Sequence, residues 1–186
     1  KIWTSHGPSW LTVPVHHQRD TLIKDVRINN SLPWARKHWK SIWQSYHKAA
    51  HFYGSLEATL EWMYEDQPWD TLATLNERLL SLFLDELDIP VKVLKASDYT
   101  FTGTKSALVL DMCQQLGADT YIFGALGRDY ADLAAFEQAG IKVIFQDYQH
   151  PTYSQFGGSF QSHLSVLDLL FHHGPKAKEI LLGGQL

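Results

Sequence analysis

The segment 146–155 contains the densest set of side chains able to do acid–base chemistry. It holds a carboxylate at Asp147, an imidazole at His150 and phenols at Tyr148 and Tyr153. A carboxylate can orient an imidazole, which then removes a proton from an amine or hydroxyl. The spacing predicts that His150 is a general base positioned by Asp147. The alternative is a loop histidine that only forms hydrogen bonds.

A second candidate is the loop that ends in Gly103, Thr104, Lys105 and Ser106, directly before an expected helix. Free amide N–H groups at a helix N-terminus, two hydroxyls and an ammonium together favour an anion. The loop is not a Walker A loop, because the Gly-Lys-[Ser/Thr] order is absent. We therefore predict that these residues bind an anionic ligand, the alternative being an ordinary N-cap beside a solvated lysine.

A third candidate is the loop formed by Gly124, Gly127, Arg128, Asp129 and Tyr130. Its glycines permit a close backbone approach, and an arginine holds a carboxylate or phosphate through two parallel hydrogen bonds. The alternative is a tight turn in which Arg128 pairs with Asp129 on the surface. Two glycine-containing loops that each carry a cation favour an anionic small molecule such as a nucleotide-sugar.

Tyr153 and Gln155 of the acid–base segment are also expected to contact the ligand.

Metal binding is not expected, because no His-Glu-x-x-His motif or cysteine pair is present. His47 and His51 are nevertheless spaced i,i+4, and adjacent histidines occur at 16–17 and 172–173. No Gly-x-Ser-x-Gly elbow indicates a serine hydrolase. The single cysteine, Cys113, lies in an apolar helical stripe and is expected to be buried.

A parallel sheet would bring the candidate loops together. The segments Val91–Leu94, Thr120–Phe123 and Ile141–Phe145 have the composition of strands, and helices are expected at Ser106–Gly117 and Ala131–Ala139. This β-α-β-α-β order with short connections predicts parallel neighbours and right-handed crossovers. Ligands bind at the carboxyl ends of such strands.

The N-terminal half is expected to form short strands and a helical lobe. The expected elements are strands at Trp10–Val15 and Asp25–Ile28, helices over 34–50 and 54–87 with a break at Gln67-Pro68, and a last helix over 165–171. We predict the α/β class, in a single domain 1–186 with a helical lobe over 1–89 and the parallel-sheet half over 90–186.

Composition narrows the class of protein. With 45% hydrophobic and 19% charged residues among 186, the chain is typical of compact globular proteins. A net charge of -4 disfavours a nucleic-acid partner. No apolar run reaches the roughly 18 residues that a membrane-spanning helix needs, and no signal peptide is evident. We expect a soluble, cytoplasmic protein.

The sequence resembles the WbqC-like proteins of bacteria, which are often encoded among genes for O-antigen and other surface polysaccharides. The first matches are Trp10–Val15, Ile23–Val26, Ile28, Trp34, Arg36–Ser41, Tyr46, Gly103–Ser106, Leu116–Tyr121, Gly124, Arg128–Tyr130 and Gly140–Ile141. They continue with Gln146–Tyr148, His150–Pro151, Tyr153, Gln155, Leu164–Phe171 and Gly174–Pro175. Family members usually begin with a strand and a His-Gln-Pro and Pro-Trp motif that precede the start of this sequence, so we expect part of the family's site to lie outside it.

The resemblance implies a transferase of lipopolysaccharide or other surface-glycan biosynthesis, because the family has been suggested to include glycine transferases acting on sugars. We expect Lys105 and Arg128 to hold an anionic donor, either a nucleotide or an activated acyl compound, while His150 deprotonates the acceptor. His38 matches a family position and is a further catalytic candidate, although it also fits a core stripe. The rival hypotheses are a nucleotide-dependent ligase or nucleotidyltransferase, and a non-catalytic scaffold protein.

Overall fold

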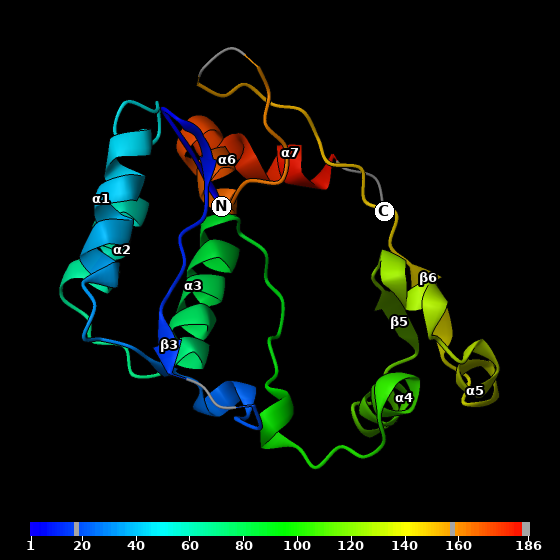
Figure 1. The fold of residues 1–186 in the computed structure, drawn as a ribbon. Coiled ribbons are helices and arrows are strands. Elements are labelled where there is room, and N and C mark those ends of the chain that lie inside the picture. The colour runs from blue at the N-terminus through cyan, green and yellow to red at the C-terminus, as the bar shows by residue number, and fades with distance from the viewer. Residues whose placement is uncertain (17–18, 157–158, 184–186) are drawn as a thin grey trace. The chain divides into compact units, whose positions relative to one another are not determined.

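The computed structural model describes residues 1–16, 19–156 and 159–183. Within these ranges the chain forms two compact units. Figure 1 shows the ribbon coloured by residue number, from blue at the N-terminus to red at the C-terminus. The larger unit comprises Lys1–Val91 and His150–Gly183, and the smaller unit comprises Lys92–Gln149. The smaller unit is therefore an insertion between two parts of the larger one, whereas the sequence places its only division near residue 90.

The three helices predicted for the first half of the chain are confirmed. They are α1 (Trp34–Tyr46), α2 (Ser55–Glu65) and α3 (Leu72–Glu86). Pro68 interrupts the helical pattern as expected, because it lacks an amide N–H to continue the ladder. Thr71 then starts α3, since its hydroxyl accepts the amide N–H of the residue three positions later.

The last predicted helix is also present, as α6 (Val166–His173). The Ser165 hydroxyl caps it by accepting an amide N–H from the first turn. A 3₁₀ turn over Gly174–Lys176 leads into a short helix, α7 (Ala177–Leu182), which the sequence analysis did not predict. No helix in the described part of the chain is long and apolar enough to cross a membrane.

The strands of the larger unit are short antiparallel pairs. β1 (Ile2–Thr4) pairs with β2 (Gly7–Ser9), and β3 (Val15–His16) pairs with β4 (Arg27–Ile28). The predicted strand at Trp10–Val15 is therefore wrong over most of its length, because pairing begins only at its last residue. Trp10 is 76% exposed, so its large ring does not mark a buried strand.

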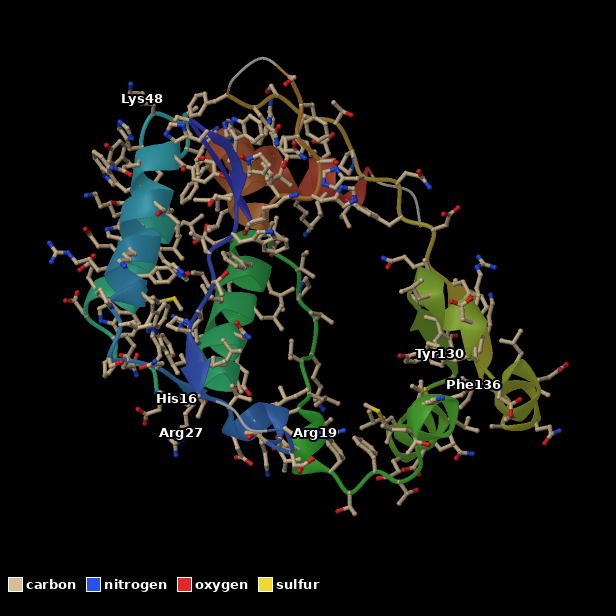
Figure 2. The ribbon with its side chains drawn as sticks, viewed as in Figure 1. His16, Arg19, Arg27, Lys48, Tyr130 and Phe136 are labelled. Carbon is tan, nitrogen blue, oxygen red and sulfur yellow. The ribbon has the colours of Figure 1, made fainter. Side chains whose placement is uncertain are left out.

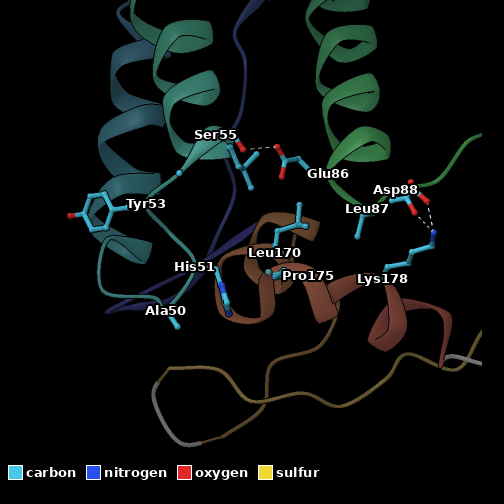
Figure 3. A pocket seen from close by; sticks show the side chains of 13 residues that line it. Ala50, His51, Tyr53, Ser55, Glu86, Leu87, Asp88, Leu170, Pro175 and Lys178 are labelled. Atoms are coloured by element: carbon cyan, nitrogen blue, oxygen red, sulfur yellow. Dashed lines mark hydrogen bonds and ion pairs between the residues drawn. The ribbon is translucent and has the colours of Figure 1, made fainter.

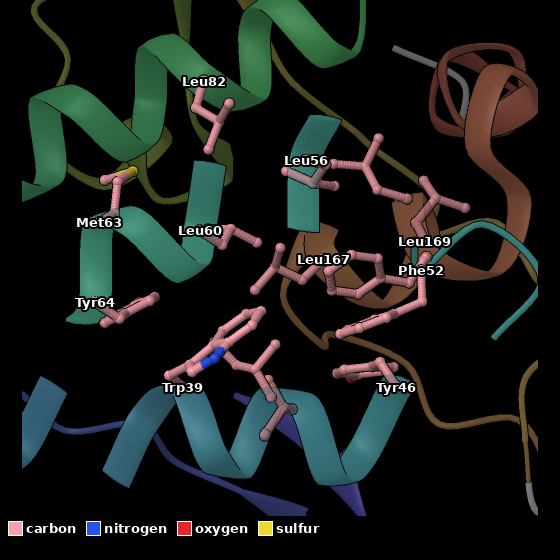
Figure 4. Packing of buried hydrophobic residues seen from close by; sticks show 14 of the residues in the cluster. Trp39, Tyr46, Phe52, Leu56, Leu60, Met63, Tyr64, Leu82, Leu167 and Leu169 are labelled. Carbon is pink, nitrogen blue, oxygen red and sulfur yellow. The ribbon is translucent and has the colours of Figure 1, made fainter. Parts of the chain in front are cut away.

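One apolar core holds the larger unit together, and Figure 4 shows its packing. Tyr46 of α1, Phe52 in the following loop, Leu60 of α2 and Phe171 of α6 are all buried. The ring centroid of Phe171 lies 4.8 Å from that of Phe52 and 5.4 Å from that of Tyr46. The late helix α6 therefore completes a core that the first half of the chain begins.

The smaller unit contains α4 (Lys105–Gln115), β5 (Thr120–Phe123), α5 (Leu133–Gln138) and β6 (Lys142–Phe145). β5 and β6 are parallel, with their last residues directly opposite one another. The α/β class is thus confirmed, with a small parallel sheet in the second half of the chain. Cys113, Phe123, Phe136 and Ile141 form the buried cluster of this unit, in which Figure 2 labels Phe136.

The predicted first strand of the sheet, Val91–Leu94, is not a strand in the structure. The sheet of the smaller unit consists of β5 and β6 in the described ranges. Val91 and Val93 are 57% and 54% exposed, whereas a strand inside a parallel sheet buries such side chains. The composition of this segment indicated a strand, but a strand also needs a neighbour that accepts and donates its backbone hydrogen bonds.

Candidate functional site

The loop before α4 has the backbone geometry of a tight helix entry. Gly103 and Lys105 both have positive φ angles, of 84° and 51°. The buried Ser106 hydroxyl accepts the amide N–H of Asp132 at 2.9 Å, so it joins the start of α4 to the start of α5. Thr104 and Lys105 are exposed, and no carboxylate in the described ranges pairs with the Lys105 ammonium.

The loop after β5 forms a 3₁₀ turn over Ala125–Asp129, with Gly124 at its N-cap. Gly127 is buried, and a Cβ atom added there would lie 2.5 Å from the Cβ atom of Phe123. Packing therefore demands this glycine, whatever the ligand. The Tyr130 ring meets the Phe123 ring edge-on, at 5.8 Å between centroids.

Arg128 lies over an aromatic ring of the neighbouring strand. Its Cζ atom is 4.7 Å from the centroid of the Phe145 ring, which favours a cation–π interaction. No Arg128–Asp129 ion pair forms among the described residues, so the surface pair considered as an alternative is not seen. Arg128 is exposed, and its guanidinium N–H groups meet no hydrogen-bond acceptor among the described residues.

Contacts within the smaller unit bring the loops to one edge of its sheet. The Gln146 amide N–H donates to the Phe123 carbonyl oxygen at 2.8 Å, immediately beyond the ends of both strands. The Ser106–Asp132 bond and the Arg128–Phe145 contact join the other loops to this edge. This edge carries two exposed cations, Lys105 and Arg128.

The predicted acid–base pair divides between the two units, with Asp147 in the smaller and His150 in the larger. The Asp147 Oδ1 atom accepts a hydrogen bond from Gln149 Nε2 at 3.3 Å. His150 Nδ1 lies 2.8 Å from the Pro151 carbonyl oxygen, and His150 Nε2 accepts the His163 amide N–H at 3.3 Å. The pairing of Asp147 with His150 therefore stays a prediction.

Gln155 connects the segment after His150 to α6. Its Nε2 atom donates to Asp168 Oδ2 at 2.7 Å and to the Gln161 carbonyl oxygen at 3.0 Å, while its Oε1 atom accepts the Gln161 amide N–H at 2.8 Å. The amide is therefore fully used inside the protein. A shallow hollow of about 460 Å³ lies beside it and is lined in part by Tyr153 and Phe160.

Asp168 is the most deeply buried ionisable group near this segment, with no exposed surface. Its Oδ1 atom has no hydrogen-bond partner among the described residues and lies 3.8 Å from His172 Nδ1. Burial first, and then the Asp168 carboxylate, raise the pKa of Tyr46 well above its ordinary value, so this phenol keeps its proton. The sequence analysis missed Asp168, whose signal is a single acid inside an apolar helical run.

Histidines of α6 hold the same segment in place. His172 Nδ1 donates to the Asp168 carbonyl oxygen at 2.7 Å, and its Nε2 atom accepts the Phe156 amide N–H at 3.2 Å. His173 Nε2 lies 3.0 Å from the Ser154 carbonyl oxygen. In the described ranges, no three His, Cys, Asp or Glu side chains gather closely enough to hold a metal ion.

His38 is a buried histidine of the larger core, 7% exposed. Its Nε2 atom donates to the Thr12 carbonyl oxygen at 3.2 Å, and its ring packs edge-on against those of Trp34 and Tyr64. Burial lowers its pKa from the ordinary value, which favours the neutral ring. The catalytic role suggested for His38 remains a prediction.

A pocket of about 500 Å³ lies entirely within the larger unit and contains none of the residues singled out as catalytic or ligand-binding from the sequence. Figure 3 shows it where the start of α2, the end of α3 and the turn between α6 and α7 meet. Ser55 Oγ donates to Glu86 Oε1 at 3.4 Å, and Lys178 Nζ lies 3.0 Å from Asp88 Oδ2. His51 forms part of the wall.

Backbone contacts fix the position of His51. Its amide N–H donates to the Phe171 carbonyl oxygen at 3.0 Å. Its ring lies directly on Gly174, where an added Cβ atom would come within 2.6 Å of the imidazole Cγ and Nδ1 atoms. His47, the other member of the i,i+4 pair, instead stacks on Trp43 and bonds to its carbonyl oxygen.

Comparison with known proteins identifies the family of the chain. Residues 1–180 match the model of the WbqC-like protein family. A protein of Mycobacterium tuberculosis (strain ATCC 25618 / H37Rv), described as "Uncharacterized protein Rv1507c", is 34% identical over 187 residues, which cover 97% of this chain and 79% of the relative. No solved structure matches the chain. The chain belongs to the WbqC-like protein family.

Proposed function

We propose that this protein is a transferase that moves an acyl or aminoacyl group, such as glycyl, onto a sugar during synthesis of a bacterial surface polysaccharide. Its membership of the WbqC-like family supplies the context. The observation that carries the proposal is the pair of exposed cations, Lys105 and Arg128, on loops at the carboxyl edge of a parallel sheet. That edge is where α/β proteins bind phosphorylated and carboxylated ligands.

The smaller unit would bind the anionic part of the donor. Arg128 would hold a phosphate or carboxylate through two parallel hydrogen bonds, while Phe145 beneath it keeps the guanidinium plane fixed. Lys105 would add a second positive charge next to the amide N–H groups at the start of α4.

In the transfer itself, the acceptor amine or hydroxyl attacks the carbonyl carbon of the donor, a new C–N or C–O bond forms, and the leaving group departs with the bonding electrons. The acceptor's proton passes to His150, which acts as the general base. This step requires the His150 Nε2 atom to release the His163 amide N–H, because the same lone pair must take the proton.

The direct test is incubation with acyl and aminoacyl donors and nucleotide-sugars, read by mass spectrometry. Lys105→Gln and Arg128→Gln should each raise KM for the donor by about tenfold or more, since each removes a charge-assisted contact. Lys142→Gln is the matched control, because Lys142 is an exposed cation at the opposite end of β6. Full turnover by His150→Ala would refute the assignment of the base.

Further measurements separate the transferase from the two rival hypotheses. ATP consumption, together with ATP-dependent thermal stabilisation that Lys105→Ala abolishes, would assign the loops to a nucleotide-dependent ligase or nucleotidyltransferase. Absence of stabilisation by every nucleotide and sugar tested, with a partner protein that co-purifies, would favour a scaffold.

A further inference from the structure

The pocket of the larger unit has a chemistry of its own. Its volume of about 500 Å³ is large enough for a ligand of monosaccharide size. The lining comes from segments far apart in the sequence, around residues 50–56, 86–88 and 170–178, all of which belong to the larger unit. The chemistry of the donor-binding loops does not involve it.

Glu86 gives the pocket an uncompensated negative charge. It is the last residue of α3, where the helix dipole already makes the potential negative and disfavours an acid. Among the described residues no cation pairs with Glu86, whose partner is the Ser55 hydroxyl at 3.4 Å. A cationic ligand would relieve this unfavourable arrangement.

Lys178 is not available to neutralise Glu86. Its ammonium binds both the side-chain Oδ2 atom and the backbone carbonyl oxygen of Asp88, just beyond the end of α3. Figure 3 shows this pair at one side of the pocket and the Ser55–Glu86 bond at another. The two acids and one lysine therefore leave the lining with a net negative charge.

His51 adds a hydrogen-bonding group. Its backbone is held by the amide bond to the Phe171 carbonyl oxygen, and its ring lies close to Gly174 at the exposed side of the pocket. No group in the described ranges forms a hydrogen bond with either ring nitrogen. The imidazole can therefore donate through one nitrogen and accept through the other, which suits a hydroxyl group of a ligand.

We propose that this pocket binds a small hydroxylated primary amine, such as an amino sugar. Glu86 pairs with the ammonium, and His51 and Ser55 form hydrogen bonds with hydroxyl groups next to it. Neutral sugars lack the ammonium, and anions are repelled by Glu86. Assigning this ligand as the acceptor of the transfer reaction, through one of its hydroxyl groups and not through the ammonium that Glu86 holds, rests on the proposed function, whereas the binding itself does not.

Isothermal titration calorimetry with D-glucosamine, D-glucose and N-acetyl-D-glucosamine tests the proposal on the intact chain. Glucosamine should bind about tenfold or more tightly than either of the others, because only it carries an ammonium for Glu86. Glu86→Gln should weaken glucosamine binding by a similar factor. Asp85→Asn is the matched control, since it removes the same charge from the adjacent, exposed residue of α3.

Gly174→Ala provides a second variant, because the new Cβ atom displaces the His51 ring without changing any charge, and it also strains the backbone at the positive φ of 49°. It should weaken glucosamine binding while thermal unfolding reports whether the fold persists, and His51→Asn should weaken binding in the same way. Equal affinity for glucosamine and glucose, or equal losses in Glu86→Gln and Asp85→Asn, would overturn the proposal.

Binding and turnover distinguish this inference from the proposed function. Glucosamine binding that depends on Glu86, without any acyl transfer, would uphold the pocket and reject the transferase. Acyl transfer to an amino sugar with an unchanged acceptor KM in Glu86→Gln would uphold the transferase and reject the pocket as its acceptor site.

Discussion

The larger and the smaller unit differ in how much apolar surface supports their candidate sites. In the larger unit, one core joins β1, the helices α1 to α3, and the late helix α6. In the smaller unit, the buried cluster consists of Cys113, Phe123, Phe136 and Ile141. Stability scales with the apolar area removed from water. The pocket therefore lies in the more stable unit, and the loops around Lys105 and Arg128 lie in the less stable one.

The largest effect is expected in the larger core. Phe171→Ala removes a ring with no exposed surface that packs on Phe52 and Tyr46, so the free energy of unfolding should fall by about 3–5 kcal/mol. Urea unfolding measures this loss. Leu182→Ala, at a side chain that is 65% exposed, is the control and should change stability by less than about 0.5 kcal/mol.

A smaller, local effect is expected from Gly127→Ala. The new Cβ atom would lie 2.5 Å from the Phe123 Cβ atom, and the resulting overpacking should cost about 1–3 kcal/mol. Hydrogen exchange should accelerate within 105–145 and stay unchanged in α1 to α3. Gly124→Ala is the control, because its Cβ would meet nothing within 4 Å. Faster hydrogen exchange throughout both units would contradict the expectation that the two units open independently of each other.

The pH dependence of the larger unit should include a contribution from His38. Its pKa is lowered by burial, so below the ordinary value of 6.5 the unfolded chain binds the proton more readily than the folded one. Stability should therefore be full above this value and fall as the pH drops through it toward the lowered pKa. His38→Gln should flatten this part of the curve of unfolding free energy against pH, and an unchanged slope would refute the assignment.

The smallest effect concerns Asp111 in the smaller unit. The Thr102 amide N–H and then the Gln115 side chain lower the pKa of this exposed carboxyl below its ordinary 3.8. Its contribution is present above that value and is lost as the pH falls through the lowered pKa. NMR titration should show the Thr102 amide signal moving with Asp111, and Asp111→Asn should abolish that movement.

Local patterns predicted most of the helices and the parallel pair. Pro68 and Thr71 delimit α2 and α3, and the crossover through α5 makes β5 and β6 parallel neighbours. Val91–Leu94 shows the limit of such patterns, since the composition of a segment favours a strand but does not show whether a partner strand exists.

The candidate sites also differ in whether the sequence alone could reveal them. The loops around Lys105 and Arg128 were recognisable because their residues are adjacent in sequence. The pocket was not, because His51, Glu86 and Gly174 meet only after the core has formed. Asp168 was concealed by the apolar residues around it, which predicted a buried helix and gave no reason to single out its carboxylate.

The interruption of the larger unit by the smaller one also sets an order of events during synthesis. The ribosome releases Lys92–Gln149 before α6 has been made, so the smaller unit is free to fold while the larger one still lacks Leu167, Leu169, Leu170 and Phe171. Until those residues emerge, the apolar faces of α1 and α2 lack the part of their cover that α6 supplies. Nascent chains of this protein should therefore engage chaperones most strongly in the interval between the two halves of the larger unit.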